Sequence, residues 1–293
     1  MTRDINGLHH TSVLTRDLDG LANVYHSFGF VLSPRSRHLL SKSEGAGRDP
    51  VPTCTANRCA LFGDSYIELL GIVDESAPDP WRARAVADRY EGFQAVAFET
   101  DDARSSGRRL AAAGLPASDV VELERGAATR EGRRTLRARF IHLDPAATDE
   151  GRVGIAQHLT REYVHQPHYL DHPNGARGID GVLIVADDPV FTEVVDRYAR
   201  ILGAPPRYEG PVAGLEMGRG RLEVVRASAA GEVLPGEPAP APSYLAAMTI
   251  RVEDVGVARD VVERNGTATR ATEDGFFVSA RDTLGAGLFF TAR

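Results

Sequence analysis

The chain has 293 residues, of which 41 are acidic and 34 are basic, so its formal charge near neutral pH is −7. Basic runs and basic–aromatic patches do not occur, and we therefore expect no nucleic-acid partner and no anionic membrane surface as partner. With 42% hydrophobic and 26% charged residues, the composition is that of a globular protein long enough for two domains.

The N-terminal segment lacks the apolar run of a signal peptide, and no stretch approaches the ~20 apolar residues of a membrane span. The two cysteines, Cys54 and Cys59, are too few for a disulfide framework. We therefore expect a cytoplasmic protein. Its richness in arginine and alanine is typical of bacteria with GC-rich genomes.

Four segments of the chain follow one plan. Each begins with a β-rich run, continues with apolar residues at helical spacing, and is followed by short apolar or alternating runs. An acidic residue precedes each helical run and a glycine ends it, as helix caps favour. The acidic residues are Asp17, Asp102, Asp188 and Asp254, and the glycines are Gly29, Gly114, Gly203 and Gly266. The pattern predicts a βαβββ unit repeated four times, over 5–72, 92–160, 178–227 and 244–291. The alternative is a generic α+β protein with evenly spaced helices, which would not explain why order, caps and strand count agree in every copy.

The opening strand GLHHTSVLTRDL and the fourth strand YIELL of the first unit resemble the vicinal oxygen chelate superfamily. This superfamily includes glyoxalase I, extradiol dioxygenases, fosfomycin-resistance proteins and bleomycin-binding proteins. The stretches TANRCALFGDSYIELLGI and HPNGARGIDGVLIVADDP are most similar to its glyoxalase-like domain group. The resemblance implies an α+β fold in which units pair into two domains with U-shaped mixed sheets. We expect a first domain over 1–165, a connector over 166–177, and a second domain over 178–293, in a monomer or a homodimer.

The same resemblance implies a metal site, because the superfamily takes metal ligands from the first and fourth strands of each unit. Carried over by position, His10 and Glu68 are the candidates in the first unit. In the second unit Ala95 takes the place of His10, and His158 takes that of Glu68. Two imidazoles and a carboxylate suit Fe, Mn or Zn with positions left open for substrate. The second domain offers only one possible ligand at these positions, which are Gly181, Glu223, Ala247 and Phe289, so we expect it to be catalytically empty.

Strand alternation separates the two adjacent histidines. Successive side chains point to opposite faces of a strand, so His10 is expected to face the cup and His9 to face away from it. Glu68 stands in an apolar strand, where a buried carboxylate needs a partner. A metal would serve, and so would an arginine such as Arg58 or Arg139.

Several residues are candidates for substrate contact. Arg35 and Arg37 flank the second strand and suit a carboxylate or phosphate, although a solvated strand edge explains them equally well. Asn57 is a candidate hydrogen-bond donor in the cup, or else a turn residue. His172 belongs to a connector expected across the mouth of the first cup, where packing between the domains is the alternative. The loop 41–55 suits a flap.

These observations support two functions. The first is a metalloenzyme that binds a small vicinal-oxygen substrate in the first domain, an anionic one if Arg35 and Arg37 contact it, and performs lyase, isomerase or dioxygenase chemistry. No residue can be assigned as its general base. The alternative is a metal-free binding protein of the bleomycin-resistance type, in which His10, Glu68 and His158 are hydrogen-bonded to protein groups.

Overall fold

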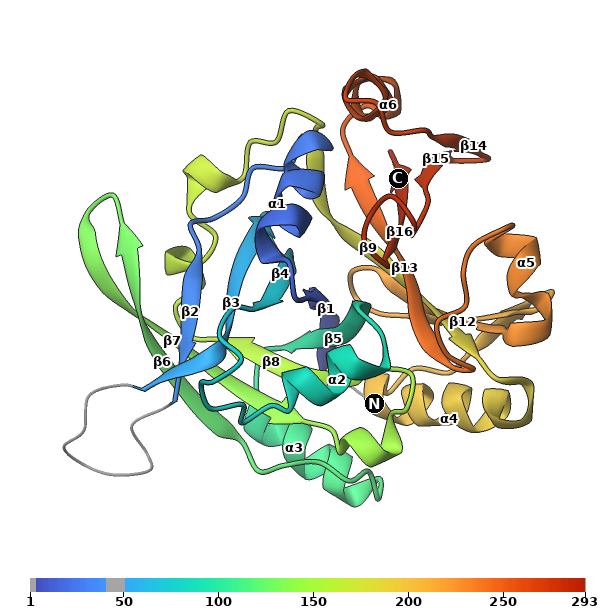
Figure 1. Ribbon diagram of the computed structural model, residues 1–293. Helices are drawn as coiled ribbons and strands as arrows, with labels where there is room; N and C mark the ends of the chain where they lie inside the picture. The colour runs from blue at the N-terminus through green and yellow to red at the C-terminus, as the bar shows by residue number, and fades with distance from the viewer. Residues whose placement is uncertain (1–3, 41–50, 293) are drawn as a thin grey trace.

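The computed structural model describes residues 4–40 and 51–292, so most of the expected flap, residues 41–50, lies outside the described residues. It contains two mixed eight-stranded sheets, each made of two βαβββ units (Figure 1). The α+β prediction and the fourfold repeat are therefore confirmed. Within the described ranges, no helix is both long and apolar enough to cross a membrane.

The first sheet has the strand order β2-β3-β4-β1-β5-β8-β7-β6. Its first unit consists of β1 (Ile5–Thr15), α1 (Leu18–Ser27), β2 (Ser36–Leu39), β3 (Pro52–Leu61) and β4 (Tyr66–Ile72). Its second unit consists of β5 (Gly92–Thr100), α3 (Ala103–Ala112), β6 (Val121–Thr129), β7 (Gly132–His142) and β8 (Arg152–His158).

The second sheet repeats this plan in the order β10-β11-β12-β9-β13-β16-β15-β14. Its first unit consists of β9 (Ala176–Ala186), α4 (Phe191–Leu202), β10 (Arg207–Glu209), β11 (Val212–Glu216) and β12 (Arg221–Arg226). Its second unit consists of β13 (Tyr244–Val252), α6 (Val255–Arg264), β14 (Arg270–Thr272), β15 (Gly275–Val278) and β16 (Gly287–Thr291).

The units are joined by their first strands. In each sheet the first strand of a unit pairs parallel with its own fourth strand and antiparallel with the first strand of the other unit. The sheet curls around this central pair into a cup. In the first cup the two wings meet, because Cys59 and Leu61 of β3 pack against Leu136 of β7.

Three of the four predicted acidic caps are observed. The carboxylates of Asp17, Asp102 and Asp254 each accept a backbone N–H from the first turn of their helix. The third helix differs, since Asp187 caps a short 3-10 turn instead and α4 begins at Phe191 without a side-chain cap. A Pro-containing turn has replaced the single capping residue there.

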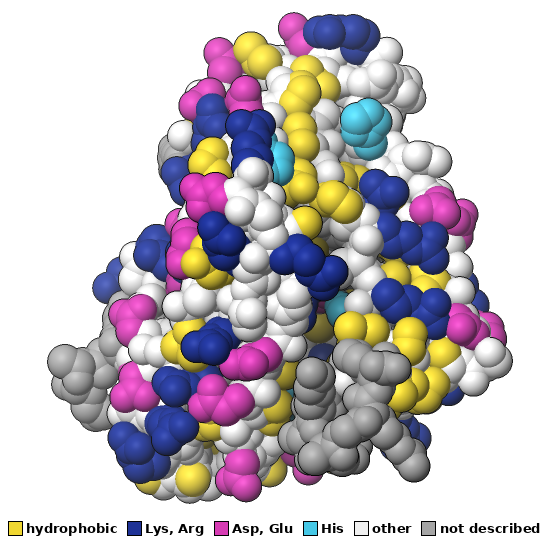
Figure 2. Space-filling model, turned by 90° about the vertical axis from the view of Figure 1, so that its left-hand side faces the viewer, with side chains coloured by type: hydrophobic (Ala, Val, Ile, Leu, Met, Phe, Trp, Pro, Cys, Tyr) yellow, Lys and Arg dark blue, Asp and Glu magenta, His cyan; other side chains and the backbone are white. Residues whose placement is uncertain are grey.

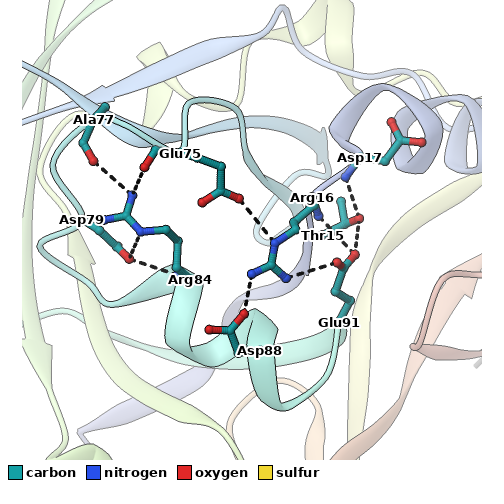
Figure 3. A network of polar contacts seen from close by, with 9 residues as sticks. All are labelled: Thr15, Arg16, Asp17, Glu75, Ala77, Asp79, Arg84, Asp88 and Glu91. Carbon is teal, nitrogen blue, oxygen red and sulfur yellow. Dashed lines mark hydrogen bonds and ion pairs between the residues drawn. The ribbon is translucent and has the colours of Figure 1, made fainter.

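A network of polar contacts closes one end of the first cup (Figure 3). Arg16, next to β1, contacts the carboxylates of Glu75, Asp88 and Glu91. Arg84 of α2 (Ala83–Arg89) donates hydrogen bonds to the backbone carbonyls of Glu75 and Ala77. Under this network α2 packs on β1, β3 and β4 through Leu14, Cys54, Ile72, Ala83 and Ala87. The helix therefore acts as a fixed cover.

The second cup is filled by its own chain. The run 231–243 reads in sequence as a semi-extended linker, but α5 (Ala230–Val233) occupies its start. Leu234, just after α5, packs with Leu183, Val225 and Phe277 on the concave face of the second sheet. Apolar side chains thus occupy the space that the first domain leaves to polar groups.

The outer faces of both sheets share one continuous apolar core. At the centre of this junction Glu150, which is 1% exposed, accepts hydrogen bonds from Arg197 Nη2 and Tyr198 Oη of α4, both at 2.7 Å. Compared with a well-packed apolar pair, a buried ion pair of this kind adds little to the free energy of unfolding. Removing one partner, however, leaves the other charge buried and uncompensated, which is strongly destabilising.

We expect Glu150→Ala to lower the free energy of unfolding by about 3–5 kcal/mol, because the Arg197 guanidinium would stay buried without its carboxylate. Chemical denaturation followed by circular dichroism measures the change. Glu263→Ala removes an exposed partner of Arg259 and is the matched control, with almost no expected effect. Equal effects of the two substitutions would contradict a structural role for the buried pair.

Candidate functional site

A β-bulge in β1 decides which histidines face the first cup. The pairing of β1 with β5 runs Leu8 with Phe98 and then His10 with Ala97, which leaves His9 as an extra residue. Such a bulge breaks the strict alternation of side chains. His9 Nδ1 consequently lies 2.7 Å from His10 Nδ1. The prediction that His9 faces away from the cup is wrong for this reason.

His9 and His10 belong to a cluster of aromatic rings at the end of the cup nearer the second domain. The ring of His9 lies 4.2 Å from that of His158, and Tyr66 stacks on His10 with ring centroids 4.8 Å apart. His165, just before the connector, lies 5.5 Å from His158. We call these residues the histidine cluster. Tyr169 and Leu170 of the connector pack at this end of the cup, against the cluster that contains Cys59 and Leu61.

Two buried imidazole nitrogens of the cluster have no hydrogen-bond partner among the described residues. They are His9 Nε2 and His158 Nδ1. His165 Nδ1 contacts the carbonyl of Phe62 at 2.5 Å, which requires the proton on Nδ1 and leaves Nε2 as an acceptor. The cluster therefore presents nitrogen atoms to an additional group.

Burial keeps these imidazoles neutral. It lowers the pKa of His9 well below the ordinary value, and the neighbouring histidines lower it further. Burial and the adjacent His165 lower the pKa of His158 to about 3. Burial lowers the pKa of His165 to about 4. Neutral imidazoles can accept or donate a hydrogen bond and can bind a metal ion.

A second polar group surrounds Glu68 deeper along β4. Its carboxylate accepts hydrogen bonds from Ser12 Oγ at 2.6 Å and from Asn57 Nδ2 at 2.7 Å. His38 Nε2 lies 3.7 Å from the same carboxylate, and His38 Nδ1 is 2.9 Å from Thr55 Oγ1. Protein groups, and not Arg58 or Arg139, are therefore the partners of Glu68.

Glu68 is ionised in this setting. Burial raises its pKa, but His38, His10 and the hydrogen bonds from Ser12 and Asn57 together outweigh burial and lower the pKa. A carboxylate has about four acceptor positions, so Glu68 can accept a further hydrogen bond from a ligand.

Arg125 of β6 is the residue that the sequence did not single out. Burial is the largest influence on the pKa of His38, Tyr66 and His158, on three other strands of the cup, and it lowers the pKa of the two histidines and raises that of Tyr66; the charge of the exposed Arg125 adds a smaller downward effect on all three. Arg125 has no ion pair with any residue that the structure describes. On the face carrying β2 and the β6–β7 hairpin, basic side chains surround a recess in which a histidine is visible (Figure 2). The β6–β7 hairpin contains several arginines, so nothing in its sequence distinguishes Arg125 from the others.

The structure does not gather His10, Glu68 and His158 into one coordination sphere. Ser12 pairs with Glu68, and the equivalent residue of β5, Ala97, pairs with Gly154. His158 lies four residues beyond Gly154, which is about 13 Å along the strand. The predicted equivalence of His158 and Glu68 is therefore wrong, because Gly154 is the residue of β8 that corresponds to Glu68. Across 4–40 and 51–292, no group of three or more His, Cys, Asp or Glu residues is arranged to hold a metal ion.

The first cup therefore contains donor atoms that suit a divalent metal, but the described residues do not arrange them as a metal site. The unpartnered nitrogens of His9 and His158 and the ionised Glu68 have the chemistry that Fe, Mn or Zn requires. Glu68, however, is held by Ser12 and Asn57, away from His158. The residues as placed do not fit a three-ligand metal centre.

The other candidate residues take different positions. Arg35 is exposed and lies 3.6 Å from Asp19 on α1. Arg37 donates hydrogen bonds to the carboxylate of Asp74 and to the backbone carbonyl of Thr53. Both ring nitrogens of His172 are engaged, one by the backbone N–H of Val31 and the other by the carbonyl of Leu61. Of the four predicted substrate contacts, only Asn57 lies beside Glu68.

The comparisons agree with this architecture. A hypothetical protein from Staphylococcus aureus has a TM-score of 0.62 at 10% identity, with 97% of this chain and 98% of that chain covered. A mutant of 4-hydroxymandelate synthase from Streptomyces coelicolor has a TM-score of 0.58 at 13% identity, covering 99% and 94%. A xylose isomerase-like TIM barrel/4-hydroxyphenylpyruvate dioxygenase fusion protein has a TM-score of 0.57 at 14% identity, covering 91% of this chain and 40% of that one. These similarities show the fold.

The two domains therefore have the paired vicinal-oxygen-chelate fold. The family model described as the glyoxalase-like domain matches residues 8–202. The chain belongs to this glyoxalase-like domain family. No curated protein matches the sequence.

The neutral histidines predict an acid-labile first domain. An unfolded histidine has a pKa near 6.5, whereas His158 and His165 have values of about 3 and about 4 in the folded chain. The unfolded state therefore binds more protons below pH 6.5, and stability falls as the pH drops from there toward 4. The slope is about 1.4 kcal/mol per pH unit for each histidine that stays neutral only when folded.

Urea denaturation at a series of pH values measures this slope. His158→Gln is expected to make the loss shallower, and His26→Gln, at an exposed position of α1, serves as the control. A slope that His158→Gln leaves unchanged would contradict the assignment.

Proposed function

We propose that the first cup is the functional site of this protein and binds a small anionic, oxygen-rich molecule. The observation that carries the proposal is Arg125. Its charge is among the smaller influences on the pKa of His38, Tyr66 and His158, on three strands of the cup, and Arg125 has no ion pair among the described residues. Arginine suits carboxylate groups because its donors form a planar fork.

The remaining polar groups of the cup would recognise the rest of the molecule. Glu68 would accept a hydrogen bond from a ligand hydroxyl, next to Asn57 and His38. The unpartnered nitrogens of His9 and His158 would contact a second polar group of the ligand. Desolvated polar groups of this kind favour a matching ligand because leaving them unpaired costs free energy.

Metal-free binding is the form that the placement of Glu68 favours. Its carboxylate is held by protein donors, as a binding protein of the bleomycin-resistance type requires. The second candidate is a metalloenzyme with isomerase, lyase or dioxygenase chemistry. The two unpartnered imidazole nitrogens favour that candidate. A bound Fe, Mn or Zn ion would supply Lewis acidity toward adjacent oxygens of a substrate.

Arg125→Met tests the binding proposal. We expect small hydroxy- and keto-carboxylates to raise the thermal midpoint of the unaltered protein, and the substitution to weaken binding about 10- to 100-fold through the loss of a charged hydrogen bond. Arg137→Met, on the same hairpin in an exposed pair with Glu124, is the matched control. If no carboxylate binds, or if both variants bind equally well, the assignment of Arg125 is wrong.

Metal analysis separates the two candidates. We expect protein purified without chelator or a nickel column to hold no stoichiometric iron, manganese or zinc, because the ligands are divided between two polar groups. About one equivalent of metal, lost in His158→Ala and kept in His26→Ala, would instead establish the metalloenzyme. The metal's identity would then direct the search for its reaction.

A further inference from the structure

A cavity of about 450 Å³ opens at the junction of the two domains, outside the first cup. Leu8 and Asp64 of the first domain line one side, and the ends of β9, β12, β13 and β16 line the other. Its size is within the range of small-ligand sites. Sequence analysis does not predict a site here, since the second domain has only one possible ligand, Glu223, at the four positions compared.

The cavity occupies the place that corresponds to the histidine cluster. The pairing of β9 with β13 passes from Ile179 to Gly181, so Asp180 is a bulged residue equivalent to His9. Arg221 pairs with Gly181 as Tyr66 pairs with His10. The second domain therefore has the Asp180 carboxylate and the Arg221 guanidinium at the positions where the first domain has the rings of His9 and Tyr66.

Three arginines line this cavity, and two of them, Arg221 and Arg251, keep donors available. Arg251 Nε lies 3.1 Å from Asp180, and Arg221 Nε lies 3.2 Å from Glu223. For both side chains, the described contacts use only Nε and leave the outer edge of the guanidinium for a second acceptor. Arg219 is held by two carboxylates, because its Nε lies 3.5 Å from Asp64 and its Nη2 contacts Glu99.

Acidic side chains line the same space. Asp64, Asp180, Glu216 and Asp274 line the cavity together with the three arginines, so a ligand there would meet groups of both signs. A simple cation would meet the three guanidinium groups. Burial raises the pKa of Asp180 in spite of Arg251, which means that its charge is only partly compensated in the free protein. A ligand that carries both signs satisfies both sets of groups.

We propose that this junction cavity binds a small zwitterion of the amino-acid or dipeptide type. The ligand carboxylate would bind the outer edges of Arg221 and Arg251, and its ammonium group would lie among Asp64 and Asp180. Thr249, Ile179 and Leu8 also line the cavity and would contact the ligand side chain. The site is independent of the first cup and of the function proposed for it.

Isothermal titration calorimetry with the common amino acids and alanyl-alanine tests the proposal. N-acetylalanine lacks the ammonium group and alaninamide lacks the carboxylate, so each is expected to bind at least about 10-fold more weakly than the matching zwitterion. No binding by any zwitterion, or equal binding by either blocked derivative, would overturn the proposal.

Two substitutions locate the site. Arg221→Met and Asp180→Asn are each expected to weaken zwitterion binding about 10- to 100-fold. Arg207→Met, at an exposed position of β10, and Arg125→Met, in the first cup, are expected to leave it unchanged. Circular dichroism tests whether each variant is folded. If Arg221→Met does not fold, the binding measured for Asp180→Asn tests the proposal. Binding that survives Asp180→Asn in a folded protein would place the ligand elsewhere.

Discussion

The pairing of the first strands of consecutive units is the constraint on which the rest of this structure depends. β1 and β5, like β9 and β13, run antiparallel at the centre of each sheet, and each carries its own fourth strand on the outer side. Because the two pairings slip at equivalent positions, both domains inherit the same bulge, at His9 and at Asp180. The bulge turns a side chain that alternation would send outward into the end of the cup.

One backbone plan therefore supports two different interiors. In the first domain the concave face keeps polar side chains, closed by α2 at one end and by the connector at the other. In the second domain the chain after β12 folds back and fills the cup with Leu234 and its neighbours. At the domain junction, ion pairs of Arg221 and Arg251 take the place that imidazoles occupy in the first domain. The duplicated architecture thus separates a polar cup from a largely apolar one.

The chemistry of the first cup follows from how burial acts on different groups. Burial opposes charge, so the histidines of the cluster become neutral, whereas Glu68 remains charged because donors and nearby imidazoles offset the cost. Neutral imidazoles and an ionised carboxylate side by side form a surface that is selective for hydrogen-bonding ligands. Arg125 adds a positive charge from the opposite wing of the sheet.

The sequence by itself determined the α+β class, the four repeated units and three of the four helix caps, because these features depend on local periodicity and on residues near one another in the chain. It also identified Glu68, His10 and His158 as residues of the first cup. Only the tertiary structure decided how they are grouped. A bulge adds one residue to β1, and the register between β5 and β8 places His158 beside His9 and far from Glu68. Only the tertiary structure shows that Arg125 lies near the other wing of the sheet. The distance between the two wings depends on the curvature of the sheet, and no local sequence pattern encodes that curvature.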